Sequence, residues 1–246
     1  MGSGQPLIIL HGLFGSSDNW QTHGKKLAEY FEVYLVDQRN HGKSDWSDEF
    51  NYDLMAQDLH EFIEARELED SILIGHSMGG KTIMRYAQEY PSSIEKMIVV
   101  DMGVKSYPIH HDVIIEGLKS INLDEISSRS EAREQLSNYI EQKSIRQFLL
   151  KNLYWIEKGK LGWRINLPVL EKRLPEITKA LPEKESLVDV LFIAGGQSNY
   201  VVPSDYDGIR NYFPLADFYV IQSAGHWIHA EAPEEFIEEV LGYCLR

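Results

Sequence analysis

The chain has 246 residues, which is enough for one large α/β domain or two small ones. Hydrophobic residues make up 43% and charged residues 25%, which is the composition of a chain with a buried core and not of a disordered segment. The formal net charge of −14 argues against nucleic acid as a partner, because phosphate contacts require a basic surface.

Six short runs rich in Ile, Leu and Val have the pattern of buried strands. In chain order they are Leu7–Leu10, Val33–Val36, Ile72–Ile74, Met97–Val100, Val190–Ile193 and Phe218–Ile221. Between the early runs, Trp20–Phe31 and Leu54–Ile63 carry apolar residues at helical spacing. Strands that alternate with helices pair in parallel, so we predict an α/β fold with a mostly parallel sheet and helices on both faces.

The alternation stops between about Val104 and Ser186, where the apolar pattern is helical and we predict no strand. The helices predicted there are Val113–Ile121, Glu131–Lys151 and Pro168–Leu181. Strands of the same sheet precede and follow this segment. We therefore expect an α/β core formed by residues 1–103 and 187–246, with a helical cap inserted at residues 104–186.

The second half of the expected cap is basic. From Lys143 to Lys184 there are ten Lys or Arg residues and four Glu, a net charge of +6 in a chain of net charge −14. Solvated outer faces of cap helices explain such a charge without any function. The alternative is that the charge concentrates anionic substrates near the site.

Residues 75–79 read Gly-His-Ser-Met-Gly and directly follow the apolar run Ile72–Ile74. The next stretch, Lys81–Glu89, has helical spacing and ends before Pro91. A strand, a tight turn and a helix are the context in which G-x-S-x-G forms a nucleophile elbow. We therefore predict that Ser77 is a nucleophile and not a polar residue of an ordinary glycine-rich turn. The backbone N–H of Met78 would then face the negative charge that develops during attack.

A serine hydroxyl needs a base that takes its proton. His226 follows the run Phe218–Ile221 after a short loop, and serine first with histidine near the C-terminus is the order found with this type of elbow. We predict His226 as the base and expect its neighbour His229 to be structural.

The loop after the first strand, His11-Gly-Leu-Phe-Gly15, occupies the place of the second oxyanion donor. The donor is a backbone N–H, and we assign it to Leu13, with Phe14 as the alternative. We expect His11 to brace this loop through hydrogen bonds and not to act as a base.

Several stretches together resemble the α/β-hydrolase-fold serine esterases, and in particular the YbfF-type branch of small esterases and thioesterases. They are residues 11–16 (HGLFGS), 37–44 (DQRNHGKS), 75–81 (GHSMGGK), 147–151 (QFLLK) and 225–231 (GHWIHAE). The similarity runs from about residue 6 to the C-terminus. It implies hydrolysis of acyl esters or thioesters by a Ser–His–Asp triad, without a metal or an organic cofactor.

The acid of the triad is missing from its usual place. In the loop after Val190–Ile193, Asn199 stands where this fold usually has Asp, and a neutral amide cannot stabilise the imidazolium that forms. Asp101 directly follows the buried run Met97–Val100, where a carboxylate needs a partner such as His226. YbfF-type esterases resemble this arrangement, so we predict Asp101 as the acid, with Asp205 as the alternative.

The function predicted is that of a serine hydrolase that cleaves carboxylic esters or acyl thioesters of small to medium acyl groups, with acyl-CoA as one candidate. Carbon–carbon bond hydrolysis and cofactor-free peroxidase chemistry are alternatives on the same triad. A catalytically silent binding module is disfavoured by the intact elbow, histidine and oxyanion loop. Phe14, Phe148, Trp155 and Trp163 are expected to line the pocket, although aromatic residues at helical spacing are often plain core.

The remaining expectations concern partners and location. Cys244 is the single cysteine, which excludes an internal disulfide or a multi-cysteine metal site and fits a reducing cytoplasm. No ligand set accompanies His110 and His111, so no metal is expected. No apolar stretch approaches membrane-spanning length and Met1–Pro6 lacks the regions of a signal peptide. We expect a cytoplasmic monomer or homodimer that acts on a small molecule and binds neither membrane nor nucleic acid.

Overall fold

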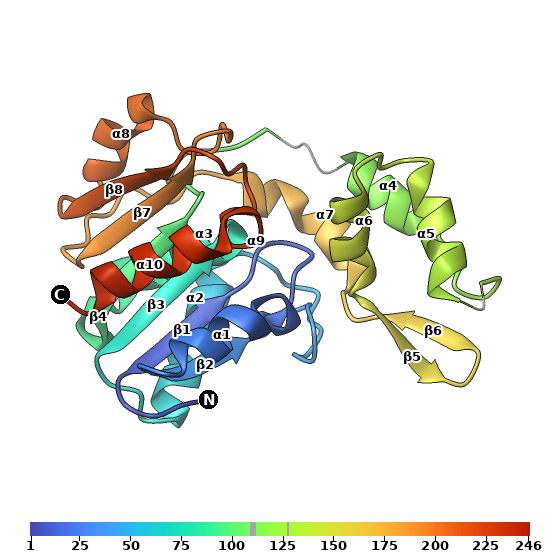
Figure 1. The fold of residues 1–246 in the computed structure, drawn as a ribbon, viewed down its shortest axis with the longest axis horizontal. Helices are drawn as coiled ribbons and strands as arrows, with labels where there is room; N and C mark the ends of the chain where they lie inside the picture. The colour runs from blue at the N-terminus through green and yellow to red at the C-terminus, as the bar shows by residue number, and fades with distance from the viewer. Residues whose placement is uncertain (109–111, 127) are drawn as a thin grey trace.

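A computed structural model of the chain describes residues 1–108, 112–126 and 128–246. Its centre is a six-stranded sheet in the order β2-β1-β3-β4-β7-β8, with every neighbouring pair parallel (Figure 1). The strands are β1 (Pro6–Leu10), β2 (Glu32–Val36), β3 (Ser71–His76), β4 (Ile94–Val100), β7 (Val190–Gly195) and β8 (Ala216–Ile221). All six predicted strands are present, and the parallel pairing confirms the predicted α/β fold.

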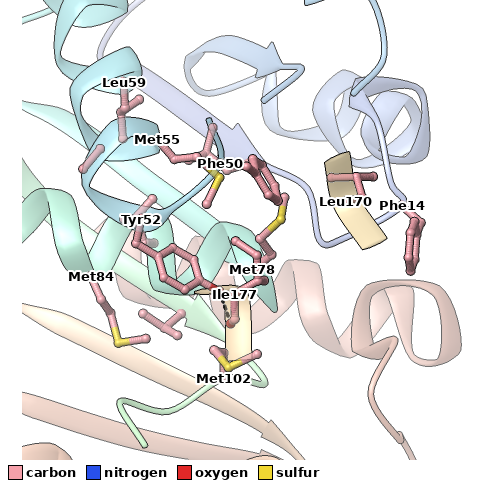
Figure 2. Packing of buried hydrophobic residues seen from close by; sticks show 14 of the residues in the cluster. Phe14, Phe50, Tyr52, Met55, Leu59, Met78, Met84, Met102, Leu170 and Ile177 are labelled. Atoms are coloured by element: carbon pink, nitrogen blue, oxygen red, sulfur yellow. Dashed lines mark hydrogen bonds between the residues drawn. The ribbon is translucent and has the colours of Figure 1, made fainter. Parts of the chain in front are cut away.

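Helices cover both faces of this sheet, because each strand alternates its side chains between two apolar clusters. In β1, Leu7 and Ile9 belong to the cluster under α1 (Gln21–Leu27) and α10 (Pro233–Cys244), which cross in front of the sheet in Figure 1. Ile8 and Leu10 belong to the cluster on the opposite face. Among the helices that contribute to this second cluster are α2 (Tyr52–Ala65), α3 (Met78–Glu89) and α8 (Tyr206–Arg210). Figure 2 shows part of this cluster, including Met55 and Leu59 of α2 and Met78 and Met84 of α3.

The elements between residues 112 and 178 lie to one side of the sheet (Figure 1). They are α4 (Asp112–Ser120), α5 (Arg129–Ser137), α6 (Lys143–Leu150), β5 (Leu153–Glu157), β6 (Lys160–Trp163) and α7 (Leu167–Thr178). Their position is that of the predicted cap, and the boundaries at residues 104 and 186 stay a prediction.

Two details of the predicted cap are wrong. The expected helix Glu131–Lys151 is two helices, α5 and α6. The segment also contains strands, because β5 and β6 pair as an antiparallel hairpin. Its local signal was the run Leu-Tyr-Trp-Ile of β5 followed by Gly159, whose φ of 84° suits a tight turn.

The two chain segments that join the cap to the core run side by side. Tyr107 N–H donates to Thr178 O at 2.8 Å, and Leu181 N–H donates to Val104 O at 2.9 Å. We refer to residues 103–107 and 177–181 as the neck. Within the described part of the chain, no helix has the length and apolar character needed to cross a membrane.

Candidate active site

Ser77 lies in a sharp turn between the end of β3 and the start of α3. Its backbone has φ 52° and ψ −116°, a left-handed conformation that costs about 1–3 kcal/mol for a residue with a side chain. Its N–H donates to Val100 O at 3.0 Å, which fixes the turn against β4. A Cβ at Gly75 would lie 2.3 Å from Gly79 O, and one at Gly79 would lie 2.4 Å from Leu10 O. The two glycines therefore allow the close approach of strand and helix that the elbow requires.

His226 lies in the loop after β8 and is hydrogen-bonded to Asp101. Its Nδ1 donates to Asp101 Oδ2 at 2.7 Å, so the ring proton is on Nδ1 and Nε2 is left to accept a proton. His226 and Ser77 line the same cavity, of about 40 Å³. Both side chains can therefore face a substrate bound in that cavity, as a nucleophile and its base must.

Asp101 is the first residue after β4 and is completely buried. Its φ of 48° turns the chain at this point, and its N–H donates to Ile193 O at 2.8 Å. Besides His226, the carboxylate accepts hydrogen bonds from the Gly195 N–H, at 3.1 Å, and from the Ser198 hydroxyl. Three donors thus satisfy a carboxylate that has no access to water.

The loop that lacks the usual acid still contacts the triad. Ser198 precedes Asn199 and donates to Asp101, while Tyr200 follows it and stacks on the His226 ring with centroids 3.9 Å apart. Sequence reasoning missed both residues. The available signal was a hydroxyl and an aromatic ring on either side of the missing acid, at the same edge of the sheet as Ser77.

Asp205 and His229, the alternative candidates for the acid and the base, lie in other environments. Asp205 accepts from Lys105 Nζ at 2.6 Å and from Val202 N–H at 3.0 Å, and the described residues show no contact between Asp205 and His226. His229 is buried with its ring stacked on Trp20, centroids 4.2 Å apart, and burial lowers its pKa to about 3. His229 is therefore a neutral packing residue, as expected.

The loop after β1 is held by two buried histidines. His11 Nδ1 donates to Gly12 O at 2.8 Å and Nε2 accepts from Gln38 N–H at 3.0 Å, which confirms that His11 braces this loop. His41 Nε2 accepts the Phe14 N–H at 3.2 Å. Burial lowers the pKa of both rings, to about 3 for His41, so both act as neutral hydrogen-bonding groups.

The hydrogen bond from the Phe14 N–H to His41 distinguishes between Leu13 and Phe14, the two candidates for the second oxyanion donor. The Phe14 N–H is already engaged, whereas the Leu13 and Met78 N–H groups have no hydrogen-bond partner in the described part of the chain. On the other side of the loop, the amide of Asn152 donates to Phe14 O at 2.7 Å. Asn152 comes from the expected cap and was not found from sequence, because its partner is distant along the chain.

Two small cavities meet at Ser77 and Leu13. The first, of about 40 Å³, is walled by Gly12, Phe14, His76, Ile114, Ile145, Phe148, Leu149, His226 and Trp227. The second, of about 30 Å³, is walled by Tyr52, Met78, Met102, Tyr107, Pro108, Leu174, Ile177, Thr178 and Tyr200. A larger cavity of about 380 Å³ adjoins the first, because Ile145, Phe148 and Trp227 line both.

Of the four aromatic residues expected at the pocket, Phe14 and Phe148 line the first cavity. Trp155 and Trp163 line neither of the cavities at Ser77. Both belong to the β5–β6 hairpin, where Trp155 is 47% exposed and Trp163 packs against the core cluster. The prediction that both tryptophans line the pocket assumed a cap without strands. The hairpin instead places them away from the two cavities at Ser77.

Among the described residues, no group of three His, Cys, Asp or Glu side chains is placed to hold a metal ion. His110 and His111, considered above for such a role, lie outside the described residues.

Comparisons with known proteins agree with this geometry. A family model described as alpha/beta hydrolase fold matches residues 5–116. The chain is 37% identical to the sn-1-specific diacylglycerol lipase ABHD11 of Danio rerio, over 98% of this chain and 79% of that protein. It is 34% identical to Esterase YbfF of Escherichia coli strain K12, over 97% of this chain and 92% of that protein. A solved structure, described as a marine microorganism esterase, superposes with a TM-score of 0.95 at 43% identity, covering 98% of this chain and 95% of that one.

Proposed function

Because the chain belongs to the α/β-hydrolase family and is a carboxylic ester hydrolase related to the YbfF-type esterases, we propose that it acts through an acyl-enzyme on Ser77. The observation that carries this proposal is the hydrogen-bonded pair His226–Asp101, which borders the same cavity as the strained Ser77. The resemblance to this family, inferred from sequence stretches alone, is confirmed by the comparisons.

The first half-reaction forms the acyl-enzyme. Ser77 Oγ attacks the ester carbonyl carbon while its proton moves to His226 Nε2, and the carbonyl π electrons move to the oxygen. The Leu13 and Met78 N–H groups donate to this oxyanion, and Asp101 stabilises the imidazolium. The carbonyl then re-forms, the bond to the alcohol oxygen breaks, and His226 gives its proton to the leaving alcohol.

The second half-reaction repeats these steps with water. His226 Nε2 takes a proton from water as the hydroxide oxygen attacks the acyl carbon. The same two N–H groups hold the oxyanion. Collapse breaks the bond to Ser77 Oγ, which recovers a proton from His226, and the carboxylic acid leaves.

The two cavities at Ser77 suggest where the two halves of the ester bind. His226 protonates the leaving alcohol, so the alcohol belongs on the side of the cavity that His226 lines. The acyl group then occupies the other cavity, which we call the acyl cavity, walled by apolar residues such as Met102 and Ile177. A volume of about 30 Å³ holds about two or three water-sized groups, so we propose small acyl groups of about two to four carbons.

The leaving group has more room, which makes a thioester such as acyl-CoA a second candidate substrate. On the alcohol side, Phe148 and Trp227 also line the adjoining cavity of about 380 Å³, whose wall includes Lys151 and Glu231. Exposed basic residues occur from Lys143 to Lys184, and the net positive charge of this segment would attract an anionic leaving group. They are Lys143, Lys151, Lys158, Lys160, Lys172, Lys179 and Lys184.

A fluorophosphonate probe tests the role of Ser77. We expect one phosphonyl adduct per chain by intact mass, located on Ser77 by peptide mapping and absent from Ser77→Ala. Hydrolysis of p-nitrophenyl esters should disappear in the same variant while its circular dichroism spectrum is kept. An adduct on another residue, or full activity in Ser77→Ala, would contradict the proposed mechanism. Ser198→Ala is a matched control, because it should still be labelled at Ser77.

A further inference from the structure

Lys81 is a completely buried lysine one helical turn after Ser77. Its backbone N–H donates to Ser77 O at 3.2 Å, and its side chain is 0% exposed. Burying an amine that is charged in water is costly, so the site must compensate for the lost hydration. The triad makes no use of Lys81, and Lys81 is not among the residues that wall either cavity at Ser77.

The Nζ atom of Lys81 joins the two chain segments of the neck. It donates to Lys105 O at 2.9 Å, on the segment that leaves the core, and to Lys179 O, on the segment that returns from the cap. It also lies 5.0 Å from the ring centroid of Tyr107 and 5.7 Å from that of Tyr52, within the range of a cation–π contact. One side chain of α3 therefore binds both connections between core and cap.

The two hydrogen bonds of Lys81 to the neck do not depend on its charge. Burial lowers its pKa from 10.5 to about 7, and no carboxylate among the described residues pairs with it. A neutral amine keeps two N–H groups, which is enough for the two carbonyls of the neck. The arrangement therefore has the features of a structural connection and not of a charge switch.

Neck residues, together with the adjacent Pro108, form one wall of the acyl cavity. Tyr107 and Pro108 line it from the outgoing segment, and Ile177 and Thr178 line it from the end of α7. Tyr52, which lies against Lys81, donates its hydroxyl to Ile177 O at 2.8 Å (Figure 2). The two carbonyls that Lys81 binds, Lys105 O and Lys179 O, thus lie within two residues of wall residues Tyr107 and Ile177.

We propose that Lys81 is a positioning residue for acyl selectivity: it fixes the neck against α3 and so sets the size of the acyl cavity beside Ser77. This rests on the proposed function, in which that cavity receives the acyl group. Without the two hydrogen bonds, the wall formed by Tyr107 and Ile177 keeps the bonds of Tyr107 to Gly103 and Tyr200 and of Ile177 to Tyr52, but it loses its attachment to α3. We expect this weaker attachment to let the wall move away from Ser77. Short acyl groups would then fit loosely and longer ones would enter.

The test compares acyl-length profiles of the wild type, Lys81→Met and a matched control. Met keeps the length of the side chain and removes its donors. Lys96→Met is the control, because Lys96 Nζ also binds backbone carbonyls, those of Tyr243, Cys244 and Arg246, and lies 5.6 Å from the Tyr243 ring. It contacts the C-terminus and not the neck. For each protein, kcat and KM are measured on p-nitrophenyl esters from acetate to decanoate.

We expect Lys81→Met to lose about tenfold in kcat/KM on acetate and butyrate, with most of the loss in KM, and to keep or gain activity on octanoate. Lys96→Met should leave the ratio of butyrate to octanoate activity as in the wild type. Fluorophosphonate labelling of Ser77 should stay within about threefold in both, because neither change touches the triad. A shift that Lys96→Met shares, or an unchanged ratio in Lys81→Met, would overturn the proposal.

A second variant covers the case in which Lys81→Met does not fold. Lys81→Gln keeps two N–H donors on a shorter side chain, so its butyrate to octanoate ratio should also fall below that of the wild type. A wild-type ratio in folded Lys81→Gln would then overturn the proposal. If the wild type is not labelled at Ser77, the proposed function itself fails. If the wild type is labelled and the ratio is unchanged by both variants, only the role of Lys81 fails.

Discussion

The assignment of Asp101 as the triad acid makes a quantitative prediction for Asp101→Asn. Two donors, the His226 Nδ1–H and the Ser198 hydroxyl, point at Oδ2, and the Gly195 N–H points at Oδ1. An amide can keep only one of these two positions as an acceptor. If its oxygen faces Gly195, its NH₂ group faces His226, and the ring must move its own proton from Nδ1 to Nε2.

That tautomer cannot take the proton of Ser77, so we expect kcat to fall about 10⁴-fold, or about 5.4 kcal/mol. Folding should be affected less. One buried hydrogen bond is exchanged or lost, which costs about 1–3 kcal/mol out of the 5–15 kcal/mol typical of a folded domain. The assay is kcat on p-nitrophenyl butyrate, with urea unfolding as the measure of stability.

Asp205→Asn is the matched control. Its partner Lys105 is 39% exposed in the side chain, and ion pairs of this kind contribute about 0–1 kcal/mol. We expect kcat within about threefold of the wild type, because Asp205 has no contact with His226 among the described residues. The reasoning is refuted if Asp205→Asn loses most of the activity while Asp101→Asn stays within about tenfold of the wild type.

Two further predictions concern pH and salt. Burial lowers the pKa of His41 and of His229 from 6.5 to about 3, so between these values the folded chain binds fewer protons than the unfolded one and stability falls as pH falls. From pH 7 to pH 5, each ring should lower the free energy of unfolding, measured in urea, by about 2 kcal/mol. The variant His229→Gln should therefore lose about 2 kcal/mol less over this range than the wild type. The same loss in the variant and the wild type would contradict this reasoning. If the basic residues of Lys143–Lys184 attract anionic substrates, the rate on acyl-CoA at low concentration should fall between about 20 and 200 mM NaCl while that on a neutral ester stays flat. An equal effect of salt on the rates with the two substrates would contradict this electrostatic attraction.

The parts of the fold that could be read from the sequence are those with a strong local period. Each buried strand is a short apolar run, and the glycines of the elbow are required by close contacts within a few residues and with β1. The β5–β6 hairpin was not predicted, because its strands are short and lie among segments with helical spacing. Only Gly159 marked the turn.

The site residues that sequence reasoning missed act through tertiary contacts. Asn152 reaches the oxyanion loop from 138 positions along the chain, and His41 reaches Phe14 across 27. Lys81 was predicted only as part of the elbow motif and of the helix after it, although its carbonyl partners, Lys105 O and Lys179 O, lie on the two segments of the neck. In each case the partner is a backbone N–H or C=O group, and a backbone partner leaves no mark in the sequence.

The sheet order explains how the acid can follow β4 and not β7. β4 lies between β3, which carries Ser77, and β7, so the ends of three adjacent strands bring Ser77, Asp101 and the loop of Ser198 together. That loop supplies a hydroxyl to Asp101 and the Tyr200 ring to His226, while Asn199 between them is exposed. A second carboxylate on this loop would raise the cost of a charged Asp101, because like charges close together disfavour ionisation. Because Asp101 supplies the negative charge of the triad, a neutral residue at position 199 avoids a second anion near the imidazole.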